Sequence, residues 1–99
     1  MKFWKSDPYE NLIKDLEKAE IMVGRVSGGY SGKYLSAEEF YTDLIKGINK
    51  LKNGDHSILK EMWGWFVPTA EWDDFVGSDG LELGNKIFER LNKLKKASS

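Results

Sequence analysis

The chain has 99 residues, of which 40% are hydrophobic and 31% are charged, and its formal net charge is −1. This length and composition indicate one folded domain spanning residues 1–99 and exclude a disordered segment. The chain has no cysteine, which excludes disulfides and thiolate metal sites, and it lacks the cationic surplus that nucleic-acid binding requires. Because no apolar run approaches the ~20 residues that span a bilayer and the first residues lack a signal segment, we expect a cytoplasmic protein that binds no membrane.

The first predicted helix covers residues 7–24. Asp7 and Pro8 are residue types that begin helices, and apolar residues recur at helical spacing from Tyr9 to Val23. Glu20 falls within this apolar face. Its carboxylate either bends to solvent near the end of the helix or is buried with a shifted pKa.

Residues 24–34 contain four glycines and two serines, a composition typical of a loop. The Gly32-Lys33 pair invites comparison with a phosphate-binding loop. That pattern requires glycine where Ser27 stands and a hydroxyl residue of the Ser or Thr type where Tyr34 stands, so we exclude nucleotide binding.

The second predicted helix covers residues 36–53. Ser36 and Glu39 have the spacing of a capping box, in which each side chain bonds a backbone N–H of the first turn. Leu35 and Phe40 are spaced as a hydrophobic staple, a contact between apolar side chains that flank the helix start.

Two further helices are predicted at residues 55–66 and 79–96. The apolar residues of the first cover about 160° of its circumference, a width that suits a central helix or one that faces a partner. Within the apolar stripe of the second, Gly84 is expected to allow a close helix approach. Between them, a short turn of helix can begin at Thr69. The predicted fold is all-α: a four-helix bundle with a long Gly/Ser-rich loop after the first helix.

Catalytic and metal sites find little support in the residue pattern. His56 is the single histidine and is interpreted as a surface or capping residue. The acidic residues between Asp73 and Glu82 do not have the spacing of a calcium loop. We therefore expect a protein that is not an enzyme and that carries no cofactor and no metal.

The charges are distributed unevenly along the chain. Residues 61–85 hold six acidic residues and no lysine or arginine, whereas the rest of the chain holds all fifteen basic residues and ten acidic ones. The same stretch contains Trp63, Trp65 and Trp72. An acidic surface accelerates the encounter with a cationic protein, and tryptophans often supply the strongest contacts of an interface. Tryptophans at helical spacing are also typical core residues, and acidic residues before a helix often cap it, so both interpretations stay open.

The segment from Glu61 to Asn85, with its Trp-x-Trp-Phe and Trp-Asp-Asp-Phe runs, resembles segments of small helical immunity proteins. These proteins are encoded beside the toxins of bacteriocin and contact-dependent inhibition systems. The resemblance implies a noncatalytic inhibitor of a cognate toxin, for instance a basic nuclease domain, and mimicry of the toxin's anionic substrate by Glu71, Asp73, Asp74, Asp79 and Glu82. Together with Trp63, Trp65 and Trp72, these acids form the predicted partner-binding surface. We expect the protein to be a monomer or weak dimer.

A second hypothesis is a small helical adaptor. In that case, the wide aromatic stripe of residues 55–66 serves for self-association or for contact with a partner helix.

Overall fold

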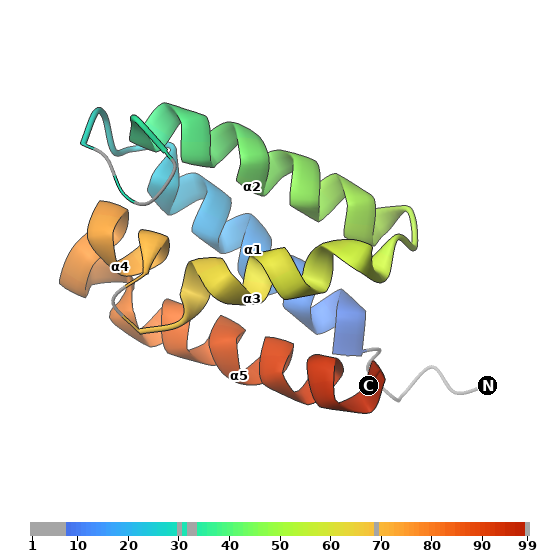
Figure 1. The fold of residues 1–99 in the computed structure, drawn as a ribbon. Helices are drawn as coiled ribbons and strands as arrows, with labels where there is room; N and C mark the ends of the chain where they lie inside the picture. Colours follow the sequence, from blue (N-terminus) through green and yellow to red (C-terminus); the bar gives the residue numbers. More distant parts are fainter. Residues whose placement is uncertain (1–7, 30, 32–33, 69, 99) are drawn as a thin grey trace.

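The computed structural model describes residues 8–29, 31, 34–68 and 70–98. This part contains five α-helices and two 3₁₀-helices, arranged as shown in Figure 1. In chain order they are α1 (Pro8–Val23), α2 (Ala37–Lys52), η1 (His56–Ile58), α3 (Leu59–Phe66), α4 (Glu71–Val76), η2 (Gly77–Gly80) and α5 (Leu81–Ser98). The prediction of an all-α bundle is confirmed, with α1, α2, α3 and α5 as its four main helices.

Two predicted segments differ in detail from the observed elements. The helix predicted over residues 55–66 is divided into η1 and α3, and η1 is capped by Asp55, whose Oδ1 accepts a hydrogen bond of 3.0 Å from the Ser57 N–H. The short turn predicted before the last helix is α4, followed directly by η2. The predicted helix starts at Asp7 and Thr69 lie outside the described residues, as does the Gly32-Lys33 pair.

The start of α2 confirms one predicted feature and corrects another. Ser36 Oγ accepts a hydrogen bond from the Glu39 N–H at 3.2 Å, and Glu39 Oε1 accepts one from the Leu35 N–H at 2.8 Å. The reciprocal cap therefore forms, with its second bond one residue earlier than in the standard box. The predicted staple between Leu35 and Phe40 is wrong: Phe40 is fully buried whereas Leu35 is 77% exposed.

The core lies between α1, which packs against both α2 and α5, and α3, which packs against α5. Each helix contributes the apolar side chains of one face, as the helical periodicity predicts. Members with no exposed surface include Leu12, Leu16, Phe40, Leu44, Met62, Ile87 and Leu91.

A buried carboxylate is present on α1, but it belongs to Asp15. Glu20 is only half-buried near the end of the helix, whereas Asp15 is 5% exposed. The Arg90 Nε–H of α5 donates to Asp15 Oδ2 at 2.7 Å, so the buried charge is paired. This ion pair joins the first helix to the last.

The junction between α4 and α5 depends on two glycines. The Trp72 indole of α4 lies directly over them, and its Nε1–H donates to the Gly80 carbonyl at 2.8 Å. A Cβ atom at Gly84 would lie 2.4 Å from Trp72 Nε1, and one at Gly80 would lie 2.6 Å from Trp72 Cζ2. The close approach expected at Gly84 is therefore present, and its partner is an indole ring.

Candidate partner-binding surface

Residues 71–82, called here the acidic segment, lie at one end of the bundle, where α1 ends and where α2 and α5 begin (Figure 1). In α4, η2 and the first turn of α5, the predicted site residues Asp74, Asp79 and Glu82 are exposed, and Glu71 and Asp73 are half-buried. These five carboxylates thus belong to three consecutive elements that pack together. The last turn of α2, at the opposite end, carries Lys50 and Lys52.

The orientation of α4 explains why its acids reach solvent. Trp72 and Phe75, three residues apart, form the buried side of this short helix. At 100° per residue, Asp73 and Asp74 fall on the opposite side. The order of residues in the Trp-Asp-Asp-Phe run therefore places the two aromatic side chains on the core face of α4 and the two acidic side chains on its outer face.

The predicted role of the tryptophans requires a correction. Trp65 is 3% exposed and packs edge-to-face on Phe40, with ring centroids 5.5 Å apart. Trp72 is 1% exposed and packs against Phe66 at 5.2 Å. Because their rings are enclosed by other side chains, these two residues stabilise the core and offer no contact area to a partner.

Trp63 differs from the other two tryptophans. It is half-buried, its ring lies against Phe88 of α5, and its Nε1–H donates to Asn92 Oδ1 at 2.7 Å. The remaining stripe residues of α3 face the interior, since Leu59, Met62, Trp65 and Phe66 are all buried. The apolar stripe that the adaptor hypothesis requires on the outside is consequently part of the core.

The exposed apolar residues were not predicted from the sequence. The large hydrophobic side chains exposed in the described part of the chain are Ile21 (58%), Leu35 (77%) and Leu81 (50%). Ile21 lies near the end of α1, Leu35 precedes α2 and Leu81 begins α5, so all three lie at the acidic end. Leu81 lies between two exposed acidic residues, Asp79 and Glu82.

The loop between α1 and α2 is attached to the acidic segment. Ser31 and Tyr34 exchange two backbone hydrogen bonds of 3.0 and 2.9 Å. Ser31, which is 6% exposed, also donates its hydroxyl proton to Asp74 Oδ2 at 2.5 Å. At the other side of the loop, the Gly28 N–H donates to Glu38 Oε1 at 3.1 Å and lowers the pKa of that exposed carboxyl.

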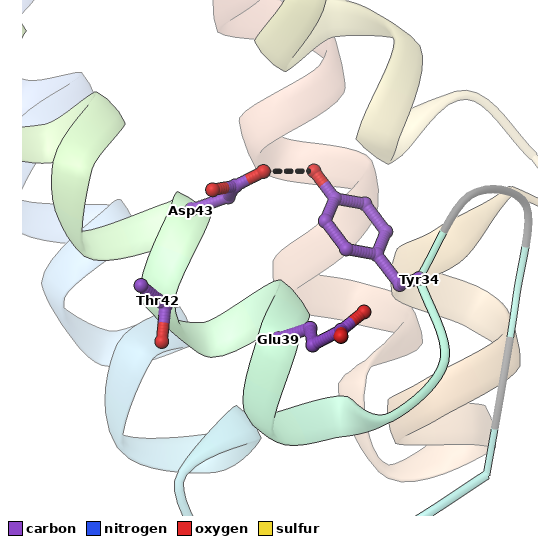
Figure 2. Close-up of a pocket in the computed structure, with 4 residues that line it drawn as sticks. All are labelled: Tyr34, Glu39, Thr42 and Asp43. Carbon is purple, nitrogen blue, oxygen red and sulfur yellow. Dashed lines mark hydrogen bonds between the residues drawn. The ribbon is translucent and has the colours of Figure 1, made fainter.

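A cavity of about 370 Å³ opens beside this loop, between Tyr34 and the first half of α2 (Figure 2). It is lined by Tyr34, Glu39, Thr42 and Asp43, and the Tyr34 hydroxyl donates to Asp43 Oδ2 at 2.8 Å. Burial raises the pKa of the Tyr34 hydroxyl above its ordinary value, and the hydrogen bond to Asp43 and the charges of Asp43 and Glu61 raise it further. The phenol therefore stays protonated in a region of negative potential.

A second groove, of about 550 Å³, lies at the opposite end, between the first half of α1 and the end of α2. His56 is exposed there, as expected, and stacks on Tyr9 with ring centroids 4.0 Å apart. The groove also contains both acidic and basic side chains, among them the Lys52–Glu17 ion pair of 2.8 Å. Its mixed charge does not select one class of ligand.

Neither metal-ligand clusters in the described part of the chain nor similarity to known proteins points to a function. No three potential metal ligands of the His, Cys, Asp or Glu type converge within the described ranges. None of the helices described is both long and apolar enough to cross a membrane. Comparison with protein families, with curated proteins and with solved structures finds no match to this chain.

Proposed function

We propose that the protein is a noncatalytic immunity protein that binds a cognate toxin through the acidic end of its bundle. The observation that carries this proposal is the charge of residues 71–85, which hold five acids and no base, together with the exposure of Asp74, Asp79 and Glu82. A surface of this kind attracts a basic domain such as a nuclease and can occupy the site that binds its anionic substrate.

The apolar contribution to this interface is assigned to Leu81 in place of the buried tryptophans. Its side chain is half-exposed between Asp79 and Glu82, so a partner that covers it also meets two carboxylates. A partner that covers this side chain would remove its apolar surface from water. Single exposed leucines are frequent in proteins, and the position of Leu81 within the acidic segment is what makes it a candidate.

The experiment begins with the toxin domain encoded by the neighbouring reading frame. Co-expression with this chain should suppress its toxicity, and the purified proteins should form a complex that weakens as salt is added. Absence of both protection and binding would contradict the immunity function.

A pair of charge-reversal variants then locates the surface. Asp79→Lys/Glu82→Lys should weaken toxin binding by about tenfold or more, mostly through slower association, and should reduce its salt dependence. Glu10→Lys/Glu89→Lys changes two exposed acids away from this end by the same total charge and serves as the control. Equal weakening by both variants would indicate general charge attraction and would overturn the assignment of the acidic end.

A further inference from the structure

The ion pair between Asp15 and Arg90 joins two helices that pack against each other, α1 and α5. Asp15 is 5% exposed and is the one charged residue among the buried residues described, whereas the Arg90 side chain is half-exposed. The Asp15 carboxylate is satisfied by the Arg90 Nε–H, which donates to Oδ2 at 2.7 Å. A movement of either helix that breaks this bond leaves a buried charge without its partner.

A buried ion pair of this kind is a poor source of net stability. Removing two charges from water costs free energy that offsets their attraction, so apolar side chains of similar volume often stabilise a core equally well. The best-supported role of a buried polar contact is to select one arrangement of helices among several. That role requires an alternative arrangement that the apolar residues would accept.

The apolar face of α1 provides such an alternative because it repeats after one helical turn. Leu12 and Leu16 are four residues apart, as are Ala19 and Val23, and all four are buried. A slide of α1 by one turn, about 6 Å along its axis, moves apolar side chains into places that other apolar side chains have left. The connection to α2 covers residues 24–36 and is long enough to follow this slide.

Asp15 distinguishes the observed register from the two neighbouring ones. A slide of one turn toward the end of α1 would bring Asp15 to the place of Ala19, which has no exposed surface. A slide in the opposite direction would bring it to the half-buried place of Asn11 and would set Ala19 against Arg90. Both slides break the ion pair, and the first also buries a carboxylate that has no partner.

We propose that the Asp15–Arg90 ion pair fixes the register of α1 along α5. The start of α5 is held by the Trp72 indole, so α5 provides the reference along which α1 is aligned. Because α1 ends where α5 begins, the same register sets the position of the exposed Ile21 relative to Leu81. This role needs no partner and is independent of the proposed function.

The test replaces the ion pair by apolar side chains in the full chain. Asp15→Ala/Arg90→Met keeps strong helix formers at both positions and places an unbranched apolar side chain on α5. Its equilibrium constant of unfolding, measured with urea, should lie within about tenfold of the wild-type value. Its ¹H–¹⁵N spectrum should show a second set of resonances, or exchange broadening, at the amides of α1 and α5, because more than one register is populated.

A spin label reports the register directly. The chain has no cysteine, so Lys18→Cys in α1 takes a single nitroxide at an exposed position three residues after Asp15. With the ion pair intact, the paramagnetic broadening of the α5 amides should decrease on both sides of one centre. Without it, we expect the broadening to extend about four residues further along α5, which is the length of one turn.

The exposed ion pair between Glu17 of α1 and Lys52 of α2 provides a matched control, because each of its side chains is 47% exposed. Glu17→Ala/Lys52→Met makes the corresponding change between two helices without removing a buried charge, so one set of resonances and one centre of broadening should remain.

The single variants separate pairing from burial. Arg90→Met should raise the equilibrium constant of unfolding by at least about tenfold, because it leaves the Asp15 carboxylate buried without its partner. Asp15→Ala should raise it less, because the half-exposed Arg90 can turn its guanidinium into water.

The proposal is overturned if Asp15→Ala/Arg90→Met gives a single set of resonances and the broadening profile of the intact pair. If that variant does not fold, Asp15→Leu/Arg90→Ala repeats the test with the added volume on α1. Failure of both apolar variants to fold would show that the ion pair is required for stability, and it would overturn the assigned role in register as well.

Discussion

The short helix α4 is held on its two sides by different kinds of contact. Toward α5, the Trp72 indole fits against Gly80 and Gly84 so closely that neither glycine has room for a methyl group. Toward the loop between α1 and α2, the contact is a hydrogen bond from Ser31 to Asp74. The first junction depends on shape and tolerates no added volume, whereas the second depends on a directed polar bond that water can partly replace.

The largest expected effect comes from adding one carbon to the α5 side. Gly84→Ala should lower the free energy of unfolding by about 3 kcal/mol, because the new Cβ collides with Trp72 and the ring cannot move without disturbing the core. Urea denaturation followed by circular dichroism measures this change. The matched control is Gly64→Ala in α3, where nothing lies within 4 Å of the added carbon and a gain of about 0.5–1 kcal/mol is expected from reduced backbone entropy. Similar losses in both variants would show that helix disruption, and not the collision with Trp72, is responsible.

An intermediate loss of unfolding free energy is expected at Tyr34, which belongs to the loop that contacts α4. Tyr34→Phe should cost about 1.5 kcal/mol near pH 8, because the hydrogen bond to Asp43 is lost. The pKa of Tyr34 is raised in the folded protein, so above the ordinary tyrosine pKa of about 10 the unfolded state releases this proton first. The contribution of the hydroxyl to stability is therefore complete below pH 10 and declines as the pH rises further.

The measurement is the difference in unfolding free energy between wild type and Tyr34→Phe at pH 8, 10 and 11. The titration of groups present in both proteins contributes equally to the two unfolding free energies and cancels in the difference. This difference should therefore decrease as the pH rises. A difference that stays constant or grows would contradict the raised pKa.

The smallest effect is expected for Ser31→Ala, which removes the bond to Asp74. A loss of about 1 kcal/mol is predicted, together with faster amide hydrogen exchange in α4. Ser27→Ala, at an exposed position of the same loop, should change stability by less than about 0.5 kcal/mol. If Ser31→Ala lowers the free energy of unfolding as much as Gly84→Ala does, the two junctions of α4 do not differ in the way described.

The helices themselves were predictable because each combines a helical apolar period with recognisable ends, as Ser36 and Glu39 illustrate in α2. The direction of individual side chains was harder to predict. A stripe that covers about 160° of α3 contains more apolar residues than one neighbour can bury. Which tryptophan stays partly exposed is decided by α5, through Phe88 and Asn92, and by no feature within α3.

The contacts that define the candidate surfaces join residues far apart in sequence or on separate elements. Asp15 and Arg90 are separated by 75 positions, and Ser31 and Asp74 by 43. A loop rich in glycine gives no local pattern from which such pairs can be inferred. The exposure of Leu81 could also not be predicted from the sequence, because a leucine in the first turn of an amphipathic helix has the same spacing whether or not another element covers it.

The separation of charge between the two ends of the bundle has a consequence at distances beyond contact. Carboxylates around α4 and the ammonium groups of Lys50 and Lys52 at the end of α2 lie at opposite ends of the molecule and contribute to an electric dipole along its length. Near a positively charged surface, this dipole experiences a torque that turns α4 toward that surface. At physiological ionic strength the torque is largely screened once the gap exceeds the Debye length of about 8 Å. Within that distance, this contribution favours encounters in which α4 faces such a surface.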